Sequence, residues 1–212
     1  MPFPLELWLI HPEPEACEAF HQRFEGLPDV RVLPARFEEL GPHDCFVTAG
    51  NAFGIMTAGI DAAVVAVHGP ALMERVQRRI VGEYLGEQPV GSCFIESTGT
   101  PAYPYVAHAP TMRMPGPIDG TDAVYRAAWA ALLAVYRHNG AARRGGTGER
   151  EIHTLAMPAL GTGFGGVGYS ESARQMAAAY RYYLHPPHRL DWDVAVARHK
   201  GISFDGGTRV VR

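Results

Sequence analysis

Two glycine-rich segments, each lying between a predicted strand and a predicted helix, constrain the fold of this chain more than any other feature. The first runs from Thr48 to Asp61 and the second from Met157 to Gly168. Glycine lets backbone N–H groups approach an anion closely, and the N-terminus of the following helix favours negative charge. Either segment alone is explained equally well as a tight connection. The two together predict a single binding site for a diphosphate-containing ligand, held without any lysine.

The spacing of apolar residues predicts strands that alternate with helices. A helical stripe runs from Val124 to Val135, and a second from Ala173 to Leu184 follows a predicted cap at Ser170. The other predicted segments are an apolar run over 5–10, a helix over 13–24, strands over 30–33 and 44–49, helices over 60–67 and 71–84, and strands over 92–97, 105–109 and 152–157. Alternation of this kind predicts a layered α/β sandwich.

The chain is predicted to be one domain over residues 1–212, because no repeat or linker divides it. We expect the core over about 30–184 and a C-terminal extension over 185–212, in which Trp192 packs a short helix onto the body. A flexible glycine- and arginine-containing loop is expected over 139–149.

Composition excludes several classes of function. The formal net charge of −3 carries no clustered basic run, so general nucleic-acid binding is not expected. Three distant cysteines, Cys17, Cys45 and Cys93, are interpreted as small buried hydrophobes, and the histidines show no zinc-ligand spacing. We expect no metal and no cofactor. The first residues lack a signal-peptide pattern and a membrane span, which favours a cytoplasmic protein.

The second glycine-rich segment also matches a dinucleotide-binding fingerprint, Gly161-x-Gly163-x-x-Gly166. Its position argues against that fold, because the residues after it are too few for the remaining strands and helices of a doubly wound domain. A phosphate-binding loop of the type G-x-x-x-x-G-K-[ST] does not occur in the chain, so a nucleotide triphosphatase is not expected.

The order and spacing of several motifs resemble the macro domain family from Val30 to Leu184. The motifs are Gly50-Asn-Ala52, Gly59-Ile-Asp61, Tyr105-Val-Ala-His108 and Pro158-Ala-Leu-Gly-Thr-Gly-Phe-Gly165. Their details are most similar to the bacterial and phage tail-assembly-like branch. The resemblance implies a three-layer α/β/α sandwich with a mixed central sheet.

The resemblance implies a site for ADP-ribose or an ADP-ribosylated substrate, with hydrolysis of the conjugate. Asn51 would bind the distal ribose hydroxyls as donor and acceptor. Asp61 would orient or deprotonate the attacking water. Asp61 is explained almost equally well as a first-turn residue that complements the helix dipole. The resemblance implies ligand contacts at Phe37, Gly50, Ala52, Gly59, Ile60, Gly161, Thr162, Gly163, Phe164 and Gly165.

Several positions depart from the family pattern. Thr57 and Ala58 replace glycines, Arg36 replaces the acid that reads adenine, and Gly165 stands in an aromatic position that Phe164 fills one residue earlier. A final strand with an adenine-stacking aromatic is not evident, although Phe204 is a weak candidate. A non-catalytic ADP-ribose reader, or a structural or assembly protein with a degenerate pocket, therefore remains open. The acceptor atom and the oligomeric state are also open.

Two polar residues near the middle strand are interpreted as structural. His108 is expected to be a core histidine that hydrogen-bonds to the backbone rather than a catalytic base. Arg113 is expected to form a surface ion pair rather than to bind a phosphate.

Overall fold

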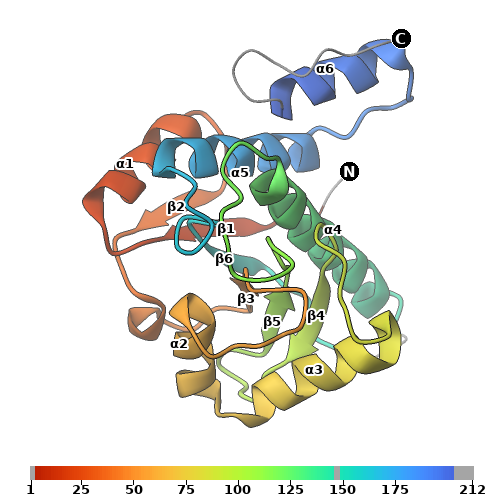
Figure 1. Cartoon of the computed structure of the whole chain (residues 1–212). Coiled ribbons are helices and arrows are strands. Elements are labelled where there is room, and N and C mark those ends of the chain that lie inside the picture. Colours follow the sequence, from red (N-terminus) through yellow and green to blue (C-terminus); the bar gives the residue numbers. More distant parts are fainter. Residues whose placement is uncertain (1–2, 146–148, 203–212) are drawn as a thin grey trace.

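The computed structural model describes residues 3–145 and 149–202, and within them six strands form one sheet in the order β2-β1-β6-β3-β5-β4 (Figure 1). The strands are β1 Glu6–Ile10, β2 Val30–Leu33, β3 Cys45–Thr48, β4 Phe94–Ser97, β5 Tyr105–His108 and β6 Thr154–Pro158. Neighbouring strands are parallel except β4, which runs antiparallel to β5 at the sheet edge. The mixed sheet that was predicted is confirmed.

Helices cover both faces of this sheet, which confirms the three-layer α/β/α sandwich (Figure 1). One face carries the first, fourth and fifth helices, and the other carries a short 3-10 helix with the second and third. The helices are α1 Pro14–Arg23, η1 Phe37–Glu39, α2 Gly59–His68, α3 Ala71–Tyr84, α4 Ala123–Arg143, α5 Tyr169–Leu184 and α6 Trp192–Ile202. A chain of alternating strands and helices buries both sheet faces in this way.

Each face of the sheet has its own apolar core, because successive side chains of a strand point to opposite faces. On β3, Cys45 and Val47 belong to the core beneath α4 and α5, whereas Phe46 belongs to the core beneath α2 and α3. Burying one such large side chain stabilises the fold by about 1.5–3 kcal/mol. The first core also contains residues of β1 and α1, such as Leu9 and Phe20, which precede the core predicted for 30–184.

The parallel strands β1, β6, β3 and β5 all end at the same edge of the sheet. The connections from β3 to α2, from β5 to α4 and from β6 to α5 therefore leave from neighbouring positions. Ligands of open α/β sheets bind at this edge, where loops from adjacent strands meet. The topology thus brings together two segments that lie about a hundred residues apart in the chain.

The loop predicted over 139–149 is wrong in its first part, because α4 continues to Arg143. Asn139 accounts for the continuation. Its side chain is 1% exposed, donates from Nδ2 to the Ile152 carbonyl and accepts from the Ile152 N–H, each at 2.8 Å. A buried amide with both ends satisfied stabilises the helix where the residue type alone predicted a break.

Two expectations for the C-terminal third are also wrong. Ser170 does not cap α5, because that helix begins at Tyr169 with Gly168 in the cap position, and the Ser170 hydroxyl accepts from Arg23 instead. Trp192 does not pack against the body, since 62% of it is exposed. The contacts of α6 with α5 run through other side chains, including the Tyr182 hydroxyl, which donates to the Arg198 carbonyl at 3.1 Å. Phe204 lies outside the described residues.

Candidate functional site

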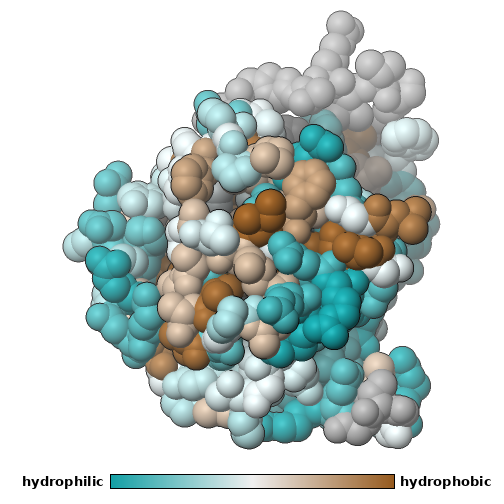
Figure 2. Space-filling view, turned by 60° about the horizontal axis from the view of Figure 1, so that its bottom comes forward, coloured by the Kyte–Doolittle hydropathy of each residue, from teal (hydrophilic) through white to brown (hydrophobic). Residues whose placement is uncertain are grey.

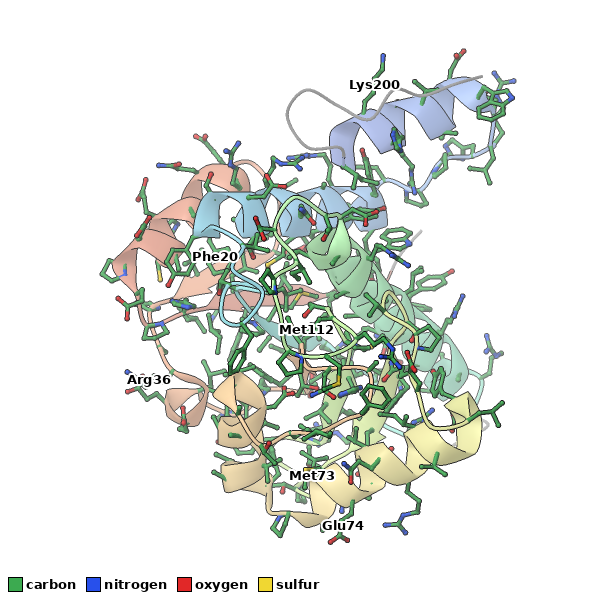
Figure 3. The ribbon with its side chains drawn as sticks, viewed as in Figure 1. Phe20, Arg36, Met73, Glu74, Met112 and Lys200 are labelled. Carbon is green, nitrogen blue, oxygen red and sulfur yellow. The ribbon has the colours of Figure 1, made fainter. Side chains whose placement is uncertain are left out.

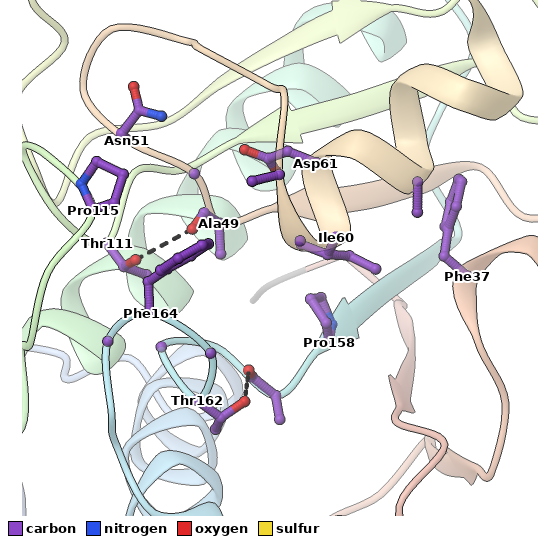
Figure 4. A pocket seen from close by; sticks show the side chains of 18 of the residues that line it. Phe37, Ala49, Asn51, Ile60, Asp61, Thr111, Pro115, Pro158, Thr162 and Phe164 are labelled. Atoms are coloured by element: carbon purple, nitrogen blue, oxygen red, sulfur yellow. Dashed lines mark hydrogen bonds between the residues drawn. The ribbon is translucent and has the colours of Figure 1, made fainter.

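A cavity of about 640 Å³ opens where the β3–α2 and β6–α5 loops face each other (Figure 4). Its size falls in the usual range for small-molecule sites. Most of the residues singled out from the sequence line it: Phe37, Gly50, Asn51, Gly59, Ile60, Asp61, Gly161, Thr162, Gly163, Phe164 and Gly165. The two glycine-rich segments therefore form one site.

The β6–α5 loop presents unused backbone donors to the cavity. Among the described residues, no acceptor receives the N–H groups of residues 161–165, although the Gly166 and Val167 N–H groups donate within the loop. The loop is anchored from behind by the Ser172 hydroxyl, which donates to the Leu160 carbonyl at 2.8 Å. Consecutive free N–H groups in a fixed turn form an anion-binding concavity.

Gly161 allows this loop its shape. Its φ of 74° lies in the left-handed region, and a Cβ at this position would come within 2.9 Å of a Val124 methyl group. Both the backbone conformation and the packing against α4 therefore require glycine.

The N-terminus of α2 is the second source of free donors. Ala58 occupies the cap position, and no side chain caps this helix. Ala58, Gly59 and Ile60 line the cavity, so the uncapped first turn and its positive dipole end face the site. The cavity thus has backbone donors on two opposing sides and no lysine in its lining.

Asp61 is the buried acid of the site. It lies in the first turn of α2, is 5% exposed, and its Oδ1 has no hydrogen-bond partner among the described residues. Burial raises the pKa of this carboxyl to about 7. Such a group exchanges a proton near neutral pH, as a general acid or base must. A helix-dipole role alone leaves the burial and the missing partner unexplained.

Asn51 is placed differently from the expectation. Its Oδ1 accepts from the N–H groups of Phe53 and Ile55 at 3.1 and 3.3 Å, and its Nδ2 donates to the Ile55 carbonyl at 2.9 Å. The carboxamide therefore braces its own loop. One N–H remains for a ligand, so Asn51 cannot serve as both donor and acceptor without breaking these bonds.

Ala52 is not part of the cavity lining, in contrast to the prediction. It is 1% exposed, and its N–H donates to the carbonyls of Met112 and Arg113 at 3.1 and 3.2 Å. An isolated β-bridge between Asn51 and Met112 explains this placement. The bridge holds the loop against the segment that follows β5, so that Ala52 faces inward.

The segment after β5 is a part of the wall that sequence reasoning missed. Thr111, Met112, Met114 and Pro115 all line the cavity, and the Thr111 hydroxyl donates to the Ala49 carbonyl at 3.2 Å. These residues form no motif. Their position directly after a parallel strand that neighbours β3 was the available indication, once the strand order is known.

Phe37 and Asn51 lie at opposite ends of the cavity (Figure 4). Phe37 is 4% exposed and packs on Phe46 with ring centroids 4.5 Å apart, so it offers part of one face to the cavity. Arg36, next to it, is exposed, and Figure 3 shows its side chain pointing away from the body. Arg36 contributes to the lining of the cavity, so an exposed cation stands at its edge where the family pattern has an acid.

The rim of the cavity is apolar and open. Ile55, Met114 and Phe164 line it and are 46%, 55% and 62% exposed. Figure 2 shows hydrophobic residues gathered through the middle of one face of the molecule, between hydrophilic ones. Exposed aromatic and aliphatic side chains at a pocket mouth are typical of binding sites.

Arg113 and His108, which were interpreted from the sequence as structural, both have structural contacts, although the partner of His108 differs from the expected one. Arg113 forms an exposed ion pair with Glu87, with Nε and Oε1 2.8 Å apart. His108 is fully buried, and burial lowers its pKa to about 4. Its ring hydrogen-bonds to the Gln88 side chain rather than to the backbone.

Within residues 3–145 and 149–202, no cluster of three or more metal-ligating side chains occurs. In the same ranges no helix has the length and apolar character needed to cross a membrane.

Comparison with known families agrees with the fold and the loops. The profile of the family described as Macro domain matches residues 47–176, which include both cavity loops and the strands between them. The chain belongs to the macro domain family. A relative from Aeropyrum pernix, described as an uncharacterized protein, is 31% identical over 136 residues, covering 64% of this chain and 62% of that protein. This macro domain thus matches less than two thirds of that relative's length.

Solved macro domains share the fold at low sequence identity. A variant of the Oceanobacillus iheyensis macrodomain with ADPR has a TM-score of 0.54 and 20% identity, covering 68% of this chain and 72% of that one. The Trypanosoma brucei macrodomain in complex with ADP-ribose has a TM-score of 0.51 and 16% identity, covering 86% and 59%. Both were therefore solved with ADP-ribose.

Proposed function

We propose that this macro domain binds ADP-ribose in the cavity and hydrolyses conjugates of ADP-ribose. The ligand is that of the solved family members, and the free backbone donors on two sides of the cavity suit its diphosphate. The donors of residues 161–165 lie on one side and the first turn of α2 on the other. Asn51 contributes its one free N–H to the distal ribose.

One observation supports hydrolysis over binding alone: the unpartnered, buried carboxylate of Asp61 lines the cavity beside these donors. In the proposed reaction a water oxygen bonds to the anomeric carbon and the bond from that carbon to the acceptor breaks. The acceptor leaves with the bonding electron pair, and Asp61 takes the water proton. Before it takes that proton, the negative charge of the Asp61 carboxylate stabilises the positive charge that develops on the ribose.

A reader that binds ADP-ribose without cleaving it is the second candidate. The bonds that tie the Asn51 carboxamide to its own loop favour this reading, because they leave Asn51 poorly equipped to orient a ribose. A structural protein with a degenerate pocket, such as the tail-assembly-like branch suggests, is the third possibility and predicts no ligand at all.

One pair of measurements tests the proposal. Calorimetry with ADP-ribose measures binding, and release of ADP-ribose from mono-ADP-ribosylated protein and from ADP-ribose-1″-phosphate measures hydrolysis. Binding with turnover that is lost in Asp61→Asn is the expected result. Binding without turnover on any substrate would assign the reader function, and neither binding nor a ligand-dependent melting shift would reject both.

A further inference from the structure

Gln88 is a polar side chain that is 0% exposed, in the connection between α3 and β4. We propose that Gln88 and His108 are positioning residues that hold the Asn51 loop, residues 51–56, against the carboxyl end of β5. What the loop does there rests on the proposed function, whereas the contacts that hold it do not. No sequence motif singles out Gln88.

The side chain of Gln88 forms two hydrogen bonds with His108. Its Nε2 donates to the His108 carbonyl at 3.1 Å, and its Oε1 lies 2.6 Å from the His108 Nδ1. Because the amide nitrogen is the donor to the carbonyl, the amide oxygen accepts, and Nδ1 carries the proton. The ring is therefore the neutral tautomer with its proton on Nδ1, in agreement with a pKa lowered by burial.

The backbone of Gln88 is hydrogen-bonded to the Asn51 loop. Its N–H donates to the Ala52 carbonyl at 2.8 Å. The N–H of the same residue, Ala52, donates to the carbonyls of Met112 and Arg113, which follow β5. One buried residue thus connects the loop to the strand end, and the segment after that strand holds the loop from the opposite side.

The loop also lies tightly on α3. Gly54 has a φ of 62°, and a Cβ there would come within 2.8 Å of Ile80 and 2.9 Å of Val76. The loop cannot move toward α3, so the Gln88 contacts and the bonds to the segment after β5 together set where it lies along the end of β5. Both ends of the Gln88 amide are satisfied, which makes the clamp rigid in a low-dielectric interior, whereas the buried His108 Nε2 has no hydrogen-bond partner among the described residues.

The position of Asn51 follows from that of its loop. The hydrogen bonds of its carboxamide go to the backbone of the loop, so a displaced loop carries the carboxamide with it. Its remaining N–H then points elsewhere relative to Asp61. Misplacement by about 1 Å at a reacting centre costs as much as about a hundredfold in rate.

The test removes the hydrogen bonds of the Gln88 side chain and compares the effect with that of removing a similar pair of hydrogen bonds elsewhere in the fold. Gln88→Met keeps the length of the side chain and deletes both bonds to His108. Asn139→Leu is the control, because Asn139 forms the same two-point amide clamp on Ile152, is equally buried and lies outside the cavity lining. Gln88→Glu keeps the acceptor for Nδ1 and loses the donor, and it replaces Gln88→Met if that variant does not fold.

The first readout is hydrogen exchange of the amides of residues 52–56, which needs no ligand. We expect exchange to rise at least about tenfold in Gln88→Met and less in Gln88→Glu, with no local rise in Asn139→Leu. Unchanged exchange in the Gln88 variants, or an equal rise in the control, would overturn the positioning role.

The second readout separates this role from general destabilisation. We expect Gln88→Met to lower kcat at least about tenfold with a smaller change in KM, while Asn139→Leu changes neither. An equal loss in both variants would overturn the role. If the wild-type protein neither binds nor cleaves ADP-ribose conjugates, the proposed function fails, and the exchange measurement still decides whether Gln88 positions the loop.

Discussion

The carboxylate of Asp61 occupies the space that a Cβ atom at residue 50 would need. Gly50 lies two residues after the end of β3 and Asp61 lies in the first turn of α2, so the glycine lets the acid lie against the main chain in the wall of the cavity. The contact explains how a 5% exposed carboxylate can still line the site. Packing of this kind, rather than a hydrogen bond, sets the position of the acid.

Gly50→Ala should displace Asp61 and lower hydrolysis at least about tenfold, because the added methyl group and the carboxylate cannot occupy the same space. The free energy of unfolding should fall by about 1–3 kcal/mol. Gly82→Ala on α3 is the control, since a Cβ there meets no neighbour and alanine favours the helix. Rates for the two variants beside the wild type check the prediction; full activity in Gly50→Ala would contradict it.

The rate of hydrolysis should rise with pH and level off above about 7, since Asp61 acts as a base only when ionised and burial raises its pKa to about 7. Asp61→Asn should lose about a hundredfold or more and lose this inflection. A profile of kcat from pH 5 to 9 measures both. Glu74→Gln, which removes an exposed carboxylate outside the cavity lining, should keep the wild-type profile.

Stability should depend on pH through the same group, with a defined sign. The folded protein binds the Asp61 proton more tightly than the unfolded chain, whose pKa is the ordinary 3.8. The contribution of Asp61 to the free energy of unfolding therefore falls as pH rises from about 4 to about 7 and is constant above. Asp61→Asn should be more stable than the wild type at pH 8 by on the order of 4 kcal/mol, and nearly equal at pH 4. Urea unfolding of both proteins at the two pH values is the measurement, and a difference independent of pH would refute the assignment.

Two glycines of the second loop should separate folding from binding. Gly161→Ala should lower both stability and ADP-ribose affinity, because its φ is 74° and its Cβ would press on Val124. A Cβ at residue 163 meets no neighbour, so Gly163→Ala should leave the melting temperature unchanged. Its affinity should nevertheless fall at least about tenfold, because a methyl group would keep the diphosphate from the backbone donors. Calorimetry with melting curves tests both, and unchanged affinity in Gly163→Ala would remove that residue from the site.

The pattern of residues predicted many of the helices and strands and the place of the two cavity loops. The helical stripe from Val124 to Val135 lies inside α4, and the two glycine-rich segments meet at one cavity, as their positions after strands indicated. Periodicity and turn residues are local properties, so they are visible in one sequence. The family motifs added the mixed central sheet and its three-layer arrangement, which local patterns cannot supply.

Contacts between distant residues were not predictable in this way. Asn139 extends α4 because its side chain hydrogen-bonds to Ile152. Ala52 turns inward because Met112 forms a bridge with Asn51 and accepts the Ala52 N–H. A helix end or a loop residue has no local property that states which partner it will find across the fold.

The residue pattern predicted two donor-rich turns at strand ends and an acid at a fixed distance after the first turn. Packing of the folded chain buries Asp61 against Gly50 with its Oδ1 unpartnered, ties the Asn51 carboxamide to its own loop, and brings Gln88 against His108. The physical reason is that burial and hydrogen-bond partnership depend on which segments pack together, and that choice belongs to the whole chain.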